Sequence, residues 1–258
     1  MTEELLVDRR GSVVWVTFNR PQARNALTKA MYDRLVDVCG MVDEDRAIRA
    51  MVITGAGQAF AAGTDINHFT AFDSDASAIE YETHGDHVMR TLERARVPVV
   101  AAIAGPCTGG GAAIASCCDL RIGAPSARFG IPIARTLGNC LSLQSYARVV
   151  ALLGLARAKD LLLTARLLNA DEMLSTGVIT ELVPEVRLLE RAEELAELVA
   201  ANAPLTQQVT KQALLRVRDR LVPDGDGADL YLTCYRSRDF REGVAAFLGK
   251  RRPVWSGE

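Results

Sequence analysis

Two stretches of small residues decide how this chain folds: Ala59–Phe69 is AFAAGTDINHF and Ile103–Asp119 is IAGPCTGGGAAIASCCD. Each follows an apolar, strand-like run and leads toward a helical segment. Gly109, Gly110 and Gly111 stand before the second helix, whose first N–H groups lack intrahelical partners. Glycines let a ligand approach that backbone, so the pattern predicts an oxyanion or phosphate site. A tight strand-to-helix turn is the alternative for the triplet taken alone.

Composition excludes several classes of protein. The chain has 258 residues, 49% of them apolar or aromatic, and a formal charge of −2. This balance predicts neither nucleic-acid binding nor a basic membrane patch, and no apolar run is long enough to predict a membrane span. The six cysteines form no C-x-x-C pair and predict free thiols in a cytoplasmic protein. Three badly spaced histidines predict no metal site, and neither a P-loop nor a dinucleotide-binding glycine motif occurs.

Hydrophobic periodicity alternates between strands and helices, which predicts an α/β core. The expected strands are 5–7, 13–18, 50–54, 97–103, 120–122, 127–129 and 178–183. The expected helices are 29–42, 79–96, 112–118, 141–153, 158–163, 171–175, 186–199, 205–218 and 230–248, with 70–78 as a mobile loop.

Four segments in one order resemble the enoyl-CoA hydratase/isomerase (crotonase) family: NRPQARNAL, ITGAGQAFAAGTDI, PVVAAIAGPCTGGG and DFREGVAAFLGKRRP. The resemblance runs from about Trp15 to Arg252. It implies an α/β fold with a ββα spiral core over residues 1–200. It further implies a C-terminal helical region over 201–258 that builds a homotrimer or a dimer of trimers and covers the coenzyme A site. The implied substrate is an acyl-CoA, so coenzyme A arrives with the substrate and no separate cofactor is expected.

The resemblance also assigns site residues. The backbone N–H groups of Thr64 and Gly110 would hold the thioester oxygen, beside Gly109. The residues implied along coenzyme A and its acyl chain are Ala23, Arg24, Ala26, Ala62, Asp65, Ile66, Phe247 and Lys250.

The chain departs from the family where the hydratases carry two glutamates. Those positions are Ala113, in GGGAA, and Ile133, in FGIPI. Neither side chain can move a proton, and general acid–base help is typically worth about 10²- to 10⁴-fold. We therefore expect an apolar acyl pocket and little ordinary hydration.

Three interpretations remain open. In the first, another residue does the chemistry: Cys140, where a dehalogenase relative carries a nucleophilic Asp after a similar Gly-Asn; His87; or Asn139 and Thr136, which would orient a water or the substrate. A buried core thiol and a surface histidine are the plain alternatives for the first two. In the second, the protein binds acyl-CoA with little or no turnover. In the third, and weakest, the spiral is only an assembly module.

Overall fold

The computed structural model describes residues 3–71, 74–222 and 227–258. The strands are β1 Leu5–Arg10, β2 Val13–Phe18, β3 Ala50–Gly55, β4 Val99–Ile103, β5 Pro106–Thr108, β6 Leu120–Gly123, β7 Arg128–Gly130 and β8 Glu181–Leu182. The α-helices are α1 Lys29–Glu44, α2 Asp75–Arg94, α3 Gly110–Cys117, α4 Ile133–Thr136, α5 Leu143–Leu153, α6 Leu155–Thr164, α7 Ala170–Thr176, α8 Leu188–Ala200, α9 Pro204–Asp219, α10 Ala228–Tyr235 and α11 Arg238–Leu248. Three short 3₁₀ turns are η1 Pro21–Ala23, η2 Ile66–Ala71 and η3 Glu185–Arg187.

A six-stranded sheet in the order β1-β2-β3-β4-β6-β8 forms the centre, and β5 pairs with β7 in a second, small parallel sheet. The β1–β2 hairpin is antiparallel, while the other pairings of the large sheet are parallel. Neighbouring parallel strands need crossover connections, and helices α1, α2 and α3 occur in the connections that follow β2, β3 and β5. This confirms the expected α/β fold with its ββα repeat.

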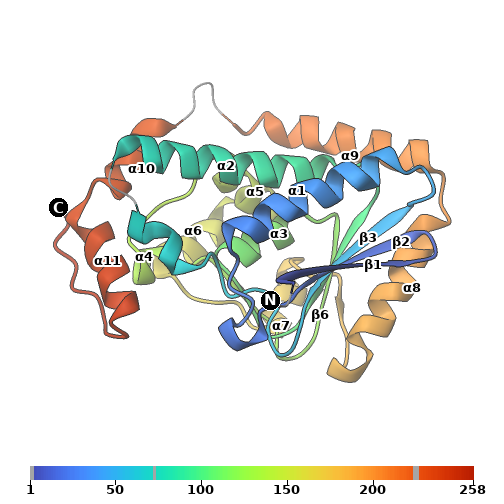
Figure 1. Ribbon diagram of the computed structural model, residues 1–258, viewed down its shortest axis with the longest axis horizontal. Coiled ribbons are helices and arrows are strands. Elements are labelled where there is room, and N and C mark those ends of the chain that lie inside the picture. The colour runs from blue at the N-terminus through green and yellow to red at the C-terminus, as the bar shows by residue number, and fades with distance from the viewer. Residues whose placement is uncertain (1–2, 72–73, 223–226) are drawn as a thin grey trace.

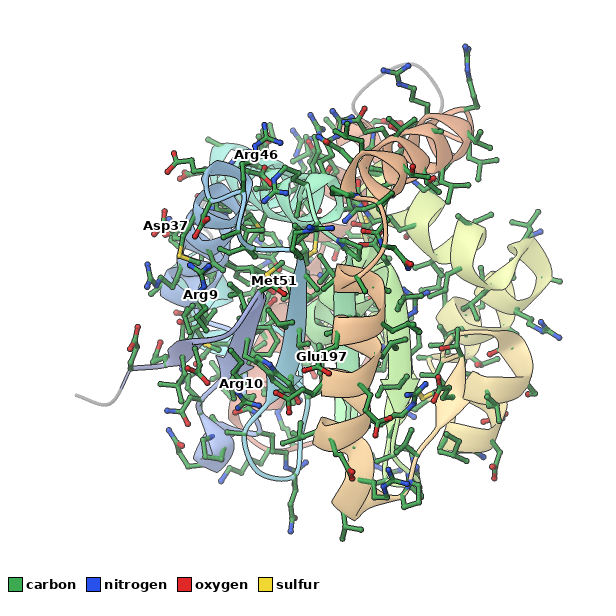
Figure 2. All side chains as sticks on the ribbon, turned by 90° about the vertical axis from the view of Figure 1, so that its right-hand side faces the viewer. Arg9, Arg10, Asp37, Arg46, Met51 and Glu197 are labelled. Carbon is green, nitrogen blue, oxygen red and sulfur yellow. The ribbon has the colours of Figure 1, made fainter. Side chains whose placement is uncertain are left out.

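The two faces of the sheet carry separate cores because successive side chains of a strand point to opposite sides. Met51 belongs to the core under α1, α2 and α3, toward which it points in Figure 2. Val52 belongs to the core under α8, the helix that carries Glu197 in the same view. Figure 1 shows α1 and α2 on one side of the sheet and α8 on the other.

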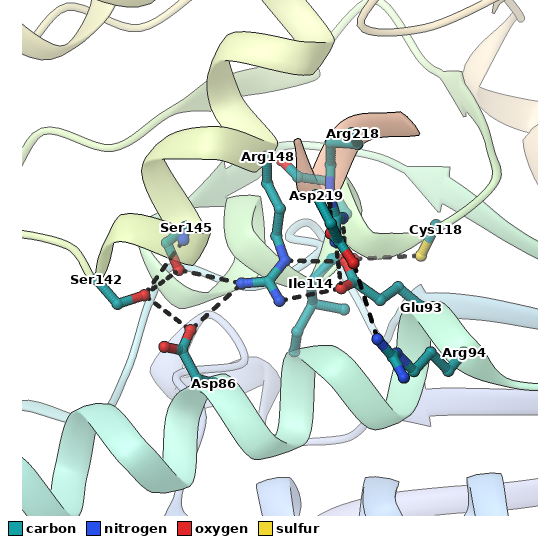
Figure 3. Close-up of polar contacts among 12 residues, drawn as sticks. Asp86, Glu93, Arg94, Ile114, Cys118, Ser142, Ser145, Arg148, Arg218 and Asp219 are labelled. Atoms are coloured by element: carbon teal, nitrogen blue, oxygen red, sulfur yellow. Dashed lines mark hydrogen bonds and ion pairs between the residues drawn. The ribbon is translucent and has the colours of Figure 1, made fainter. Parts of the chain in front are cut away.

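Helix α2 is clamped at its C-terminal half by a buried ion cluster (Figure 3). The Glu93 carboxylate accepts two hydrogen bonds from Arg148 of α5, at 2.9 and 3.1 Å, and two from Arg218 of α9, at 2.6 and 2.8 Å. Glu93 is 4% exposed, and its two arginine partners hold the pKa of its carboxyl down at about 2 against the cost of burial. Two turns earlier along α2, Ser142 donates to Asp86 at 2.7 Å. The helix that covers the site is therefore fixed to two others.

Several expected elements differ from those observed. The expected helix 230–248 is two helices, because Ser237 is extended and its side chain caps α11 by accepting from the Phe240 N–H at 2.9 Å. The expected loop 70–78 is partly wrong, since Ser74 caps α2 from Asp75 onward; residues 72–73 lie outside the described residues. Pairing of the last strand with β6 is confined to Glu181 and Leu182. Strand β5 was not expected.

In the part of the chain that the structure describes, no helix is both long enough and apolar enough to cross a membrane. Within the same residues, no group of three or more His, Cys, Asp or Glu side chains is placed to hold a metal ion.

Candidate active site

The first wall of the site is the loop 20–26, held in place by the fully buried side chain of Asn25. Its amide donates to the carbonyls of Ala56 and Ala59 at 2.9 and 2.7 Å, and its oxygen accepts from the Arg20 N–H at 2.9 Å. Asn25 and Arg24 both have positive φ, which asparagine tolerates better than most residues. This motif therefore has a structural role that the sequence analysis did not see: it ties two loops together.

The loop after β3 is tied to the first wall by a short parallel bridge between Leu27 and Thr64. Leu27 N–H donates to Gly63 O, and Asp65 N–H donates to Leu27 O, each at 2.8 Å. Arg20 also donates to the Asp65 carboxylate at 2.9 Å, so this acid shapes the loop. The bridge leaves the Thr64 N–H pointing away from Leu27.

The Thr64 and Gly110 backbones are neighbours. A Cβ built on Gly110 would lie 2.9 Å from Thr64 Oγ1 and would collide with the Tyr32 hydroxyl. Gly110 is the first residue of α3, where the helix dipole places partial positive charge. Among the described residues, neither the Thr64 N–H nor the Gly110 N–H donates a hydrogen bond to the protein. The structure thus brings two unpaired donors together, and the role expected for them at an oxyanion stays a prediction.

Three hydroxyl groups meet at this point. Thr64 Oγ1 lies 2.9 Å from Tyr32 OH and 3.3 Å from Tyr81 OH. Tyr81 also packs against the rings of His68 and Phe69, with centroids 5.2 and 5.0 Å apart. The sequence analysis missed Tyr32, Tyr81 and His68, because their helical positions look like ordinary core or surface sites.

Ala113 and Ile133, which stand where the family's hydratases carry glutamates, are half-buried in apolar surroundings. Ala113 on α3 and Ile133 at the start of α4 both pack against the main core. Gly109, at the N-cap of α3, has a φ of 53° and donates to Gly130 O at 3.0 Å, which joins the two loops that carry these residues. Thr136 donates its hydroxyl to Pro132 O at 2.9 Å, so this group is occupied within α4.

Cys140 is buried beside Cys234 of α10 in a small apolar cluster. A hydrogen bond that the Cys140 thiol donates to Cys234, together with burial, raises the pKa of the Cys140 thiol far above its ordinary value. This environment favours the thiol over the nucleophilic thiolate. Asn139, one residue earlier, donates to Tyr235 OH at 3.4 Å, and its side-chain oxygen is buried with no hydrogen-bond partner among the described residues. The role expected for Cys140 stays a prediction.

His87 is exposed and lies on another side of α2 from Tyr81. It lines a cavity of about 410 Å³ with Glu82, Asp86 and Arg90, among others. His84, three residues earlier on α2, faces α1, where its Nε2 lies 2.7 Å from Asp33 Oδ1. The structure therefore separates the two histidines, and a catalytic role for His87 stays a prediction.

The residues expected along coenzyme A fall into two groups. The first surrounds the η1 loop: Ala62 N–H donates to Arg24 O at 3.0 Å, with Ala23 and Ala26 beside Arg24 in the same turn. The second is at the exposed end of α11, where Phe247 is 53% exposed and Lys250 follows the helix. Helix α11 packs on η2, which begins at Ile66, and on α4 and α10.

A cavity of about 450 Å³ lies between η2, the start of α2, α10 and α11. Phe69, Tyr235 and Phe240 line it, and the Phe240 ring contacts the other two edge-on. The Tyr81 ring in turn contacts Tyr235 edge-on. Neither this cavity nor the one beside His87 is lined by Thr64 or Gly110. The hydroxyl groups of Tyr32 and Tyr81 occupy space beside those two residues instead.

A family model for "Enoyl-CoA hydratase/isomerase" matches residues 8–258. Over 254 residues the chain is 33% identical to a short-chain-enoyl-CoA hydratase of Clostridium acetobutylicum, covering 96% of this chain and 95% of that protein. A crystal structure of an enoyl-CoA hydratase/carnithine racemase from Magnetospirillum magneticum matches with a TM-score of 0.80 and 32% identity, covering 100% of this chain and 97% of that one. A methylmalonyl-CoA decarboxylase in complex with 2-nitronate-propionyl-CoA has a TM-score of 0.91 over 100% of both chains, but at 23% identity it shows likeness of fold alone.

The chain belongs to the enoyl-CoA hydratase/isomerase family. It has the crotonase fold and is an enzyme of that family.

Proposed function

We propose that this enzyme acts on an acyl-CoA thioester and stabilises negative charge on the thioester oxygen through the Thr64 and Gly110 N–H groups. One observation carries the proposal: the two N–H groups lie on neighbouring segments, one at a helix N-terminus, and donate to no acceptor in the described part of the protein. Preorganised donors of this kind are worth about 3 kcal/mol each to a transition state in which the oxygen becomes an oxyanion.

The reaction that we propose is not ordinary hydration. By the family resemblance, Ala113 and Ile133 stand where hydratases place their acid and base, and both side chains are apolar. An apolar wall supports binding of the acyl chain but supplies no group to activate water. The reaction therefore needs a proton-transferring group other than the two absent glutamates.

For the rest of the substrate we propose a path along the η1 loop. Arg24 is exposed, and Ala23, Ala26, Ala62, Asp65 and Ile66 are half-buried beside it or on the adjoining loop. Phe247 is exposed on α11 and Lys250 is exposed just after it, and a ring and a cation suit the adenine and phosphates of a nucleotide. Coenzyme A is part of the substrate, and we propose no separate cofactor.

We propose a homotrimer or a dimer of trimers in the cytoplasm. Helix α9 contributes no residue to the core and exposes large apolar side chains: Leu205 (69%), Val209 (62%), Leu214 (64%) and Val217 (70%). Several large exposed apolar side chains on one helix support a protein–protein contact there, and a second copy of the chain is the partner we propose. The six free cysteines support a reducing compartment.

Mass spectrometry of the purified protein incubated with enoyl-, hydroxyacyl-, halo-aryl- and malonyl-type CoA esters tests the function. Turnover of one ester supports the proposal, and the mass change names the reaction. Binding of several esters without any change of mass would favour the second candidate, an acyl-CoA-binding protein with little turnover. If no ester binds, the enzyme and the binding protein are both contradicted, and the third interpretation, a spiral that serves only as an assembly module, remains.

A further inference from the structure

A chain of three hydroxyl groups lies against the backbone of Gly110. Thr64 Oγ1 is its middle member, 2.9 Å from Tyr32 OH of α1 and 3.3 Å from Tyr81 OH of α2. Tyr32 OH is the closest side-chain atom to a Cβ built on Gly110. Because Thr64 also supplies one of the two free N–H groups, its hydroxyl is within a few ångströms of any oxygen bound there.

The two tyrosines are protonated at neutral pH. Burial raises the pKa of Tyr32 to about 12, and burial together with the neighbouring Tyr32 raises the pKa of Tyr81 well above 10. Tyr32 is 8% exposed, whereas Tyr81 is half-buried, packed with Ile66 and Leu137 at the edge of an apolar cluster. Of the two tyrosines that contact Thr64, Tyr81 is therefore the more exposed residue.

The carboxylates near this chain are already engaged. Asp65 accepts from Arg20 at 2.9 Å, Asp33 lies 2.7 Å from His84, and Glu82 accepts from Tyr235 OH at 2.6 Å. Each is held by a partner on another element. The groups that hydrogen-bond to Thr64 Oγ1 are the hydroxyls of Tyr32 and Tyr81, so a proton delivered beside Thr64 comes from a hydroxyl.

We propose that Tyr81 is the catalytic residue that donates a proton to the α-carbon of the thioester enolate, with Thr64 and Tyr32 as positioning residues for its hydroxyl. This rests on the proposed function. In the step, the enolate electron pair forms the α-carbon–hydrogen bond and the Tyr81 O–H bond breaks. The negative charge leaves the thioester oxygen for the phenolate, which accepts a hydrogen bond from Thr64 and regains a proton from water.

Hydrogen–deuterium exchange at the α-carbon of butyryl-CoA tests the step in reverse, because the same group must then remove a proton. The purified protein is incubated with butyryl-CoA in D₂O, the mass gain is followed, and the protein-free rate is subtracted. Since the pKa of Tyr81 is raised, the phenolate fraction and the exchange rate rise about tenfold per pH unit between about pH 7 and 9.

The titratable side chains beside Tyr81 are the alternative candidates for the base, and each predicts its own dependence of exchange on pH. They are Tyr32 from α1, His68 from η2, Tyr235 from α10 and Glu82 from its own helix. Burial lowers the pKa of His68 below 6.5, so a reaction that used its imidazole as the base would be flat over the same pH range.

We expect Tyr81→Phe to lower exchange at least about 100-fold. Its affinity for butyryl-CoA, measured by calorimetry, should stay within about threefold of the wild type, because the ring remains. Tyr146→Phe removes a comparable hydroxyl from α5 and should leave exchange unchanged. Tyr32→Phe should lower the rate by less than Tyr81→Phe does while keeping the tenfold slope.

Exchange that survives in Tyr81→Phe would overturn the assignment. An exchange rate that does not change between pH 7 and 9 and is lost in His68→Gln would also overturn it. So would binding of butyryl-CoA without exchange at pH 9. A protein that does not bind butyryl-CoA or any other ester of the panel contradicts the proposed function itself, which separates the two failures.

Discussion

The hydroxyl oxygens of Thr64 and Tyr32 lie 2.9 Å apart, and this contact joins the loop after β3 to helix α1 beside Gly110. Tyr32 is buried, so the pairing satisfies a hydroxyl that would otherwise be costly in the core. The same contact sets how close any side chain at position 110 can come. Glycine is required there for space, at the residue whose N–H we assign to the oxyanion.

Gly110→Pro tests that N–H, because proline lacks a donor. Its ring would also collide with Tyr32 OH, so the comparison is made in the Tyr32→Phe background, which removes the closest atom. The Cβ of either variant still lies 2.9 Å from Thr64 Oγ1, so Gly110→Ala is the reference that carries the same crowding. We expect Gly110→Pro to lose at least about 100-fold more exchange of butyryl-CoA than Gly110→Ala does. Equal rates for the two variants would remove Gly110 from the oxyanion site.

Gly40→Ala is a control for the effect of an added methyl group elsewhere. A Cβ at this mid-helix position of α1 meets nothing within 4 Å, and its φ is not positive. We expect a gain of about 0.5–1 kcal/mol in the free energy of unfolding and no change in exchange. Denaturant titration measures the first.

Glu93→Gln should destabilise the protein by about 3–5 kcal/mol, because it leaves the buried Arg148 without its closest anionic partner and with only the 3.4 Å contact to Asp86. The pKa of Glu93 is lowered to about 2, so its contribution is present above pH 4.5 and is lost as pH falls toward 2. Urea titrations at pH 7 and pH 3 should show a smaller difference between wild type and variant at pH 3. Glu80→Gln, at an exposed site on the same helix, should change stability by less than about 0.5 kcal/mol.

Glu82 should act in the opposite sense. Burial raises the pKa of its carboxyl from 4.5 to about 7, so the unfolded chain releases this proton first and stability falls as pH rises between those values. The loss through this group is on the order of 2 kcal/mol. Glu82→Gln keeps an acceptor for Tyr235 and should flatten that part of the stability profile. An unchanged profile would show that Glu82 titrates normally.

The thiols should differ in reactivity. The hydrogen bond that Cys234 accepts from Cys140 lowers the pKa of Cys234 to about 7, and the Cys234 side chain is half-buried. Burial raises the pKa of Cys107 far above its ordinary value. Iodoacetamide at pH 7.5, followed by peptide mass mapping, should label Cys234 first and leave Cys107 unlabelled. Slower labelling of Cys234 in Cys140→Ala, which lacks the donor, would support the pairing, whereas an unchanged rate would contradict it.

Sequence periodicity predicts the sheet well because its strands are nearly continuous apolar runs between glycines. Strand β3, for example, was expected at 50–54 and ends at Gly55. Periodicity cannot predict the two-residue β8 or the short β5, because their pairing depends on strands that are distant in the sequence. The break between α10 and α11 carried a signal that was not used: Ser237 precedes an acidic first turn, as an N-cap does.

The backbone part of the site is visible in the sequence because small residues and glycines mark it. The hydroxyl groups are not, since Tyr32 and Tyr81 lie far from Thr64 along the chain. Asn25 shows the same limit, because its three hydrogen bonds tie together loops that are far apart in the sequence, and no local pattern predicts those contacts.

Hydration of crotonyl-CoA tests the account most directly. The value of kcat/KM is measured for this protein beside a family member that keeps both glutamates, under identical conditions. With Ala113 and Ile133 in those positions, the account predicts a rate at least about 10³-fold lower. Comparable rates would contradict it, because water would then be activated by a group that the account does not contain.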